Sequence, residues 1–398
     1  MANSIPSVDQ LIARAKELMP GLRKTALETE KRRRVSAETA QLFQEAGFFR
    51  VLQPKRHGGY EMDYGVQMRL AAELGRGCAS SAWAMSVIGC HAWLLGMYSA
   101  EAQDEVWGKD SSTLLSSSFA PVEMKAERAP GGINLSGRWK FSSGVDLCRW
   151  AMLFAILPPQ DGKGPPDPIF AVVPLDGTKA KVEDTWHVSG LAGTGSNDIV
   201  VDNVFVPEHR IASFTKLRGG PTAGSATSDS HIYRMSVFAV FPVNLIGAAL
   251  GAAQGALDLV VAGLAERKAL SQVKLADQQS VQLRIARAAA HVNAAEALLL
   301  QTTETMNRRY RAGNEVPLVE RADWRLNICY AAELCGQCVD TIFPLLGGRG
   351  LLATDAVQRA WRDVHAVMQH VAIVWDPTAV PYAWSGSASH GRICWRFS

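Results

Sequence analysis

A single histidine interrupts an otherwise apolar stretch of the sequence. Residues 80–98 are apolar nearly all round a helix, and His91 is the conspicuous polar exception. An imidazole titrates at a pKa of about 6.5, so it can accept or share a proton near neutral pH. The ordinary alternative is a buried histidine whose ring is satisfied by a backbone carbonyl. His91 is therefore a candidate for proton-transfer chemistry.

Two of the seven cysteines have a spacing that could hold a metal or form a redox pair. Cys335 and Cys338 form a C-x-x-C, but no second pair follows and the surrounding segment is expected to be helical. The odd total and the scattered positions do not match the disulfide framework of a secreted protein. We expect no metal site, and reduced thiols in the cytoplasm.

The composition is typical of a globular protein of two or three domains, with 398 residues of which 47% are hydrophobic. The net charge of +3 gives no reason to expect nucleic acid or an anionic membrane as partner. The basic run 31–34 is expected to be a solvated helix face, and the N-terminus shows no secretory signal pattern.

Two common nucleotide-binding motifs are absent from the sequence. No G-x-G-x-x-G follows an expected strand and opens a helix, and no G-x-x-x-x-G-K-[ST] occurs. Neither a Rossmann nicotinamide site nor a P-loop is therefore expected. Any NAD(P)H chemistry must take place elsewhere.

Residues 237–265 are apolar enough to resemble a membrane span. Asn244, Gln254 and Asp258 interrupt this stretch, and three glycines spaced four apart fall on one face of the expected helix. Such a face lets another backbone approach closely. We therefore expect a buried bundle helix and no membrane.

Helical and β patterns divide the chain into three parts. Residues 1–115 show helical spacing, and residues 116–230 show short β-branched and aromatic runs separated by turn residues. Helical spacing returns in residues 231–398, in four segments. The predicted fold class is α+β, with an N-terminal helical domain, a central antiparallel β-barrel or sandwich, and a C-terminal four-helix bundle.

This order of domains resembles the acyl-CoA dehydrogenase family, and several strings agree with its motifs. The resemblance spans nearly the whole chain and implies the fold of that family. The matching strings are residues 45–54 with His57-Gly58-Gly59, Gly193–Ser196 leading into Val204–Pro207, Glu266-Arg267, Leu346–Gly350 and Arg362-Asp363.

The sequence departs from the dehydrogenases of this family at the catalytic base. The family places a Glu at one of two locations, where it takes the α-proton of an acyl thioester. No Glu lies between Glu208 and Glu266, and the C-terminal location reads VMQHVAIV over residues 367–374, with only Asp376 beyond. The dehydrogenation reaction therefore lacks its expected base.

Three features instead resemble flavin-dependent monooxygenases of the same fold, the oxygenase components of two-component systems. These features are His91, the Ser142-Ser143-Gly144 that follows a W-K-F string, and His370. The resemblance implies hydroxylation of a small phenol-like aromatic compound by a C4a-hydroperoxyflavin. Dioxygen and reduced FMN or FAD would be consumed, with the flavin supplied by a separate NAD(P)H:flavin reductase.

The same resemblance implies roles for these residues. Either Ser142 or Ser143 would hold the flavin N5, although a Ser-Ser-Gly can equally be a simple turn. His91 would contact the substrate oxygen. His370 would assist proton delivery, with His365 as the competing candidate.

Further residues are assigned to the cofactor. The turn 193–196 offers backbone N–H groups and a hydroxyl. Arg267 resembles a bundle arginine that reaches the flavin phosphate of a neighbouring subunit, which implies a homotetramer. The expected contacts are Trp139, Phe141, Ser143, Gly193, Thr194, Gly195, Ser196, Arg267, Gly347 and Gly348.

Three alternatives stay open. The same flavin chemistry could oxygenate sulfur or nitrogen instead of a phenol ring. An acyl-thioester dehydrogenase could use an unconventional base such as Asp376. A relative without catalytic activity could serve as a binding or assembly protein.

Overall fold

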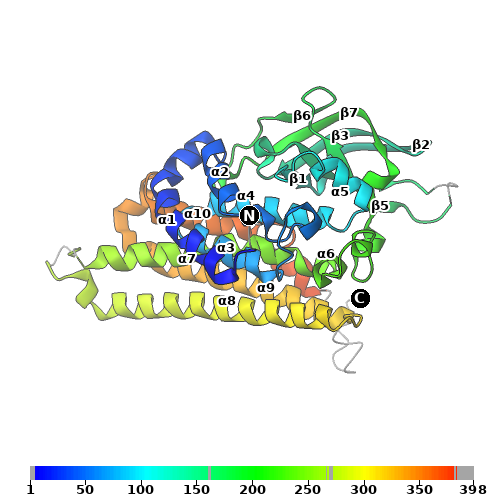
Figure 1. Cartoon of the computed structure of the whole chain (residues 1–398). Helices are drawn as coiled ribbons and strands as arrows, with labels where there is room; N and C mark the ends of the chain where they lie inside the picture. Colours follow the sequence, from blue (N-terminus) through cyan, green and yellow to red (C-terminus); the bar gives the residue numbers. More distant parts are fainter. Residues whose placement is uncertain (1–4, 160–162, 266, 269–271, 381, 383–398) are drawn as a thin grey trace, which may run out of the picture.

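The computed structural model describes residues 5–159, 163–265, 267–268, 272–380 and 382 of the chain. Helices, then strands, then helices follow one another along the sequence (Figure 1). The order of the three parts confirms the predicted fold class. In Figure 1 the strands lie at the top, the long helices of the bundle lie at the bottom, and N-terminal helices lie between them.

Five α-helices form most of the N-terminal part. They are α1 (Val8–Arg32), α2 (Ala37–Glu45), α3 (Gly65–Gly75), α4 (Ala79–Leu95) and α5 (Ala100–Trp107). Ser7 begins α1 with a capping box that it forms with Gln10. Every residue of α4 is buried, because this helix is apolar all round and packs against α1, α3, α7 and α10. The helix that carries His91 is thus the centre of the helical core.

The central part consists of two four-stranded sheets that share one core. The strands are β1 (Leu115–Ser118), β2 (Ala120–Ala129), β3 (Gly132–Ser142), β4 (Trp150–Leu157), β5 (Asp167–Pro174), β6 (Ala180–Glu183), β7 (Asn197–Pro207) and β8 (Ile211–Ser213). One sheet has the order β1-β4-β5-β8 and the other the order β2-β3-β7-β6. All pairs are antiparallel except β1 with β4. Of the two architectures that the sequence left open, the strands therefore form packed sheets and no closed barrel.

The C-terminal part is a helical bundle. The short α6 (Val237–Val240) leads into α7 (Pro242–Leu264), α8 (Gln279–Arg311), α9 (Leu318–Ile342) and the shorter α10 (Ala356–Met368). By length and composition, residues 237–264 could cross a membrane. However, 67% of the most apolar 18-residue stretch within them is buried inside the protein. This helix packs against α3, α4, α8, α9 and α10. The expectation of a buried bundle helix is confirmed.

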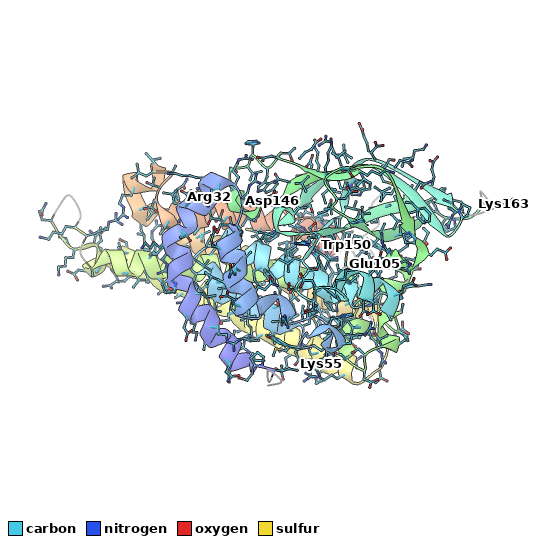
Figure 2. All side chains as sticks on the ribbon, turned by 45° about the horizontal axis from the view of Figure 1, so that its top comes forward. Arg32, Lys55, Glu105, Asp146, Trp150 and Lys163 are labelled. Carbon is cyan, nitrogen blue, oxygen red and sulfur yellow. The ribbon has the colours of Figure 1, made fainter. Side chains whose placement is uncertain are left out.

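Ion pairs fasten the end of α1 to the β part. Arg33 lies 2.6 Å from Asp184 and Arg34 lies 3.0 Å from Asp146. Figure 2 labels Arg32 at the end of α1 and Asp146 beside this junction. The expectation that this basic run is only solvated is therefore wrong for two of its arginines, because their carboxylate partners are more than a hundred residues away in sequence.

Candidate active site

The ring of His91 is fully buried, and both of its nitrogen atoms have protein partners. Nδ1 lies 2.8 Å from Leu115 O and Nε2 lies 2.7 Å from Ser117 Oγ. Because a carbonyl oxygen can only accept, Nδ1 carries the proton and Nε2 accepts from the Ser117 hydroxyl. Burial lowers the pKa of His91 to about 4. The ring is therefore neutral at pH 7 and fixed in one tautomer.

Ser117 is a site residue that the sequence analysis did not single out. It belongs to β1, whose leucine and three serines are all buried. The next residue, Ser118, donates from its hydroxyl to Lys140 O at 2.5 Å, which holds β1 against the end of β3. The run of three serines is a signal in the sequence that could have drawn attention to this strand. When such hydroxyls are buried, each needs a hydrogen-bond partner.

A β-bulge near the end of β3 breaks the alternation of side chains, so that Lys140 and Phe141 are both exposed between the buried Trp139 and Ser142. The pairing with β7 shifts register between Trp139 and Ser142, and Phe141 has a φ of 65°. Phe141 is consequently 58% exposed, while Ser142 is fully buried. The exposed Phe141 ring lies 6.0 Å from the ring of Trp186.

Ser142 and Ser143 differ in their hydrogen bonds. Ser143 Oγ accepts from Trp83 Nε1 at 3.0 Å and lies 2.8 Å from Ser196 Oγ. Ser142 Oγ is buried and has no partner among the described residues. A buried polar group without a partner costs roughly 1–3 kcal/mol. Of the two serines that the sequence could not distinguish, Ser142 is the one whose hydroxyl is available to a ligand.

His370 lies in the turn that follows α10, against two aromatic rings. Its Nδ1 accepts the backbone N–H of Ala372 at 3.1 Å, so Nε2 carries the proton of the neutral ring. The ring centroids of Trp83 and Phe241 lie 5.7 Å and 6.4 Å away. Burial and the charge of Arg325 lower the pKa of His370 to about 4. His370 is thus a neutral side chain with one N–H to donate.

The competing candidates have other surroundings. His365 Nε2 lies 3.1 Å from Asp340 Oδ1, and its ring packs on Trp361 at 4.4 Å. Asp376, considered as an alternative base, is exposed. The geometry therefore favours His370 over His365.

Aromatic side chains connect the His370 region with β1. Phe119 directly follows β1, and its ring lies 5.3 Å from Phe241 and 4.6 Å from Phe170. Phe241 in turn lies against His370. This series of rings makes the region between β1 and His370 apolar and aromatic, as the lining of a site for a flat compound usually is.

The turn 193–196 is packed into the protein interior. A Cβ at Gly193 would lie 2.7 Å from Thr29 Cγ2 and 3.0 Å from Ser80 Cβ, and Gly195 has a φ of 58°. The hydroxyls of Thr194 and Ser196 bond to each other at 2.7 Å. Close packing against α1 and α4 thus explains Gly193, the positive φ explains Gly195, and both hydroxyls face protein groups. A contact of this turn with a cofactor stays a prediction.

Trp139 is placed differently from the expectation that it contacts the cofactor. Its side chain is fully buried in the core between the two sheets, and its Nε1 donates to Phe154 O at 2.7 Å. The bulge after Trp139 explains the difference, because it breaks the alternation that would place Trp139 and Phe141 on one face. The Phe141 ring is therefore open to a ligand, whereas the Trp139 side chain is enclosed by the core and bonded to the β4 backbone.

Arg267 and the glycine pair form a second group at one end of the bundle. The Arg267 guanidinium donates to Leu345 O at 2.8 Å and to Leu346 O at 3.2 Å. Gly347 and Gly348 follow directly and are exposed, with open space on their Cβ side. Arg267 follows the end of α7 by three residues, and in Figure 1 α7 runs to the left, away from the strands at the upper right. Among the described residues, no contact joins this group to Ser142 within one chain. Glu266, the neighbour in the matching string, lies outside the described residues.

Family comparisons match both helical parts of the chain. Residues 13–111 match the N-terminal domain of acyl-CoA dehydrogenase, and residues 245–375 match its C-terminal domain.

Individual relatives match nearly the whole chain. The FADH(2)-dependent resorcinol hydroxylase, oxygenase component, of a Rhizobium species is 36% identical over 92% of this chain and 91% of its own. The crystal structure of 3-HSA hydroxylase from Rhodococcus sp. RHA1 superposes with a TM-score of 0.89 at 32% identity, over 97% of this chain and 98% of that one. The structure of XiaF from a Streptomyces species, in complex with FADH2 and glycerol, gives a TM-score of 0.87 at 26% identity, over 98% and 97% of the two chains.

Proposed function

The chain belongs to the flavin-dependent monooxygenases with the acyl-CoA dehydrogenase fold, as an oxygenase component, and we propose that it hydroxylates a small phenolic compound. The relatives named above include a resorcinol hydroxylase, and resorcinol is a phenol. Reduced flavin is the cofactor of this family, and the oxygenase component depends on a separate reductase to supply it.

One observation supports this proposal most strongly. The hydroxyl of Ser142 is fully buried and unpartnered, although the hydroxyl of the next residue has two partners. Most buried hydroxyls are satisfied by protein, by ordered water or by a ligand, so the Ser142 hydroxyl is available to a ligand group. The N5 edge of a reduced flavin fits this group, because it offers an N–H where Ser142 offers an acceptor.

The exposed ring of Phe141 and the partly exposed ring of Trp186 fit the flat ring system of the same cofactor. Phe141 directly precedes Ser142 at the β3 bulge, and the Trp186 ring lies 6.0 Å from the Phe141 ring, so these two rings offer a surface on which a planar group can stack. Reduced flavin, when bound, supplies the electrons that activate dioxygen for transfer of one oxygen atom. The described residues around Ser142 keep water away from this chemistry, because Ser142 and Trp83 are buried.

The pair of His91 and Ser117 suits the phenol hydroxyl of the substrate. Ser117 donates its own proton to His91 Nε2, so its oxygen retains lone pairs that can accept the proton of a phenol. A phenol that shares its proton in this way becomes more electron-rich and reacts faster with an electrophilic oxygen. His91 then acts through Ser117, because both of its ring nitrogens are already bonded.

His370 suits the donation of a hydrogen bond rather than the removal of a proton. Its Nε2 carries the proton, and its low pKa leaves the ring neutral at working pH. A neutral imidazole N–H next to Trp83 can stabilise developing negative charge on oxygen without a net positive charge in an apolar region.

We also propose that the enzyme works as a homotetramer in the cytoplasm. The exposed Gly347 and Gly348, and the Arg267 that fixes their loop, lie apart from Ser142 within one chain, so another copy would have to bring the two groups together. The six described cysteines are unpaired, which suits a reducing compartment.

The proposed function can be tested with the purified protein and chemically reduced FMN or FAD. The protein is mixed with oxygenated buffer and with one member of a panel of phenols, thioethers and amines. We expect a hydroxylated phenol in greater yield than hydrogen peroxide. Oxygenation of a thioether or an amine, with no phenol converted, would support the sulfur or nitrogen alternative, and an absence of flavin binding would contradict both.

A further inference from the structure

A continuous series of hydrogen bonds runs from α4 to the turn before β7. Trp83 Nε1 donates to Ser143 Oγ at 3.0 Å, Ser143 Oγ lies 2.8 Å from Ser196 Oγ, and Ser196 Oγ lies 2.7 Å from Thr194 Oγ1. Thr194 Oγ1 donates to Leu191 O at 2.9 Å. The series, here named the hydroxyl chain, consists of buried groups throughout.

The two ends of the hydroxyl chain fix the direction of every proton in it. Leu191 O can only accept, so it takes the single proton of Thr194 Oγ1. Ser196 must then donate to Thr194, and Ser143 must donate to Ser196. The Ser143 proton is therefore committed to Ser196, and Ser143 receives the indole N–H of Trp83.

The Leu191 end is held by α10. Leu191 has a left-handed backbone with a φ of 52°, which is strained for a leucine. Its N–H donates to Asp363 Oδ1 at 2.6 Å, and its C=O also accepts from Trp186 Nε1 at 3.0 Å. A Cβ at Gly190 would collide with the backbone oxygen of Arg362. The strained turn is thus pressed directly against α10.

Charged neighbours hold Asp363 in its buried position. Arg362 lies 2.6 Å from Glu30 of α1, and Arg359 lies 3.8 Å from the same carboxylate. The positive charges of Arg359 and Arg362 face Asp363 from its own helix. Helix α10 is therefore anchored to α1 on the side from which it binds the Leu191 turn.

The contacts of α10 lead back to Trp83, the residue at which the hydroxyl chain begins. Helix α10 ends at Met368, and the turn that follows it carries His370, whose ring packs on Trp83 at 5.7 Å. Asp363, the Leu191 turn, the hydroxyl chain, Trp83 and His370 form a closed circuit of contacts. Within this circuit Trp83 contacts both Ser143 and His370, and Ser143 contacts both Trp83 and Ser196.

We infer that Asp363 and Ser196 are positioning residues for the oxygenation site, because through the hydroxyl chain they hold Trp83 under His370 and leave the Ser142 hydroxyl free for the flavin. Neither residue has to touch the flavin or the substrate to act in this way. This inference rests on the proposed function.

Ser196→Ala interrupts the hydroxyl chain at its centre. Ser143 then loses the acceptor that fixes its proton, and Trp83 is left with a less rigid partner. We expect roughly three- to tenfold more hydrogen peroxide per hydroxylated product, the size of effect that a lost hydrogen bond produces. Ser196→Thr keeps the hydroxyl and should restore coupling. Ser86→Ala removes a different buried serine, on α4, whose hydroxyl donates to Asn244 O. This variant should leave coupling unchanged.

Asp363 is tested with a pair of variants. Asp363→Asn retains an oxygen that can accept from Leu191 N–H, whereas Asp363→Ala does not. We expect the Asn variant to couple much better than the Ala variant, with both measured below their Tm and at saturating reduced flavin.

The outcomes separate this inference from the proposed function. If wild-type protein hydroxylates no phenol, the proposed function fails. If wild-type protein is well coupled but Ser196→Ala couples equally well, or Ser196→Thr is as poor as Ser196→Ala, the positioning role is wrong. Equal coupling in the two Asp363 variants would remove Asp363 from that role, even if Asp363→Ala is also less stable.

Discussion

His91 and His370 have pKa values lowered to about 4 by burial, yet the protein holds the two rings differently. His91 is bonded at both nitrogens, to Leu115 O and to Ser117 Oγ. His370 is bonded at Nδ1 alone, by the N–H of Ala372, and otherwise rests against aromatic rings. Two histidines with a similar pKa can therefore perform different chemical tasks. The first histidine can act only through a neighbour, whereas the second has an N–H to give.

The largest expected effect on activity concerns His91 and its partner Ser117. His91→Ala should slow hydroxylation by about a hundredfold, as is typical when a group that handles a proton is removed. Ser117→Ala should slow it to a similar extent, because His91 acts through Ser117. Both are measured as single-turnover product formation with pre-reduced flavin. His365→Ala, a histidine variant outside the site, provides the matched control. A fast Ser117→Ala enzyme beside a slow His91→Ala enzyme would mean that His91 touches the substrate directly.

The next effect separates the two serines at the end of β3. Ser142→Ala should raise hydrogen peroxide per product roughly tenfold and leave Tm unchanged or higher, because its hydroxyl has no protein partner to lose. Ser143→Ala should lower Tm, because Trp83 and Ser196 both lose a partner. Product analysis and thermal unfolding of the flavin-free protein measure the two effects. A lower Tm for Ser142→Ala than for Ser143→Ala would reverse the assignment.

The smallest expected effect is the dependence of stability on pH. The pKa of His91 in the folded protein, about 4, lies below its ordinary value of 6.5, so its contribution to stability is complete above pH 6.5 and is lost as the pH falls toward 4. The contribution of this fully buried ring is of the order of 3 kcal/mol. The Tm deficit of His91→Gln relative to wild type should therefore shrink by several degrees between pH 7 and pH 5.

Asp363 acts in the opposite direction over part of the same range. Burial raises its pKa from 3.8 to about 6, so its favourable contribution is present below pH 3.8 and is lost as the pH rises through 6. Asp363 is present both in the wild type and in His91→Gln, so its contribution cancels from the difference between their Tm values. Ser86→Ala, which removes no titrating group, should show a constant Tm deficit. A constant deficit for His91→Gln would contradict a neutral, buried ring.

The sequence predicts the order of the domains, because hydrophobic periodicity is a local signal. It also singles out His91, because one histidine in an apolar helix is visible without any tertiary information. It does not identify Ser117, because the partner of that hydroxyl lies on another element and no local pattern connects them. The same limit applies to Arg33 and Arg34, whose carboxylate partners are distant in sequence.

Strand β3 illustrates the remaining difficulty. Regular alternation would place Trp139 and Phe141 on the same face, so the sequence predicts both as cofactor contacts. The left-handed backbone at Phe141 breaks this alternation, so one ring enters the core and the other reaches the surface. Nothing in a phenylalanine indicates a positive φ, because a bulky residue takes that conformation only when its surroundings impose it.

The glycines of α7 have a mechanical consequence for these side chains. A Cβ at Gly247, Gly251 or Gly255 would collide with a backbone oxygen of α3 or of the residue after it, so the two helices touch along three successive turns. Two helices meshed in this way cannot slide or roll past each other without separating. The groups on α4 and α10, which pack on the same α7, are therefore carried by a stiff frame. Their spacing is fixed before a flavin or a phenol arrives.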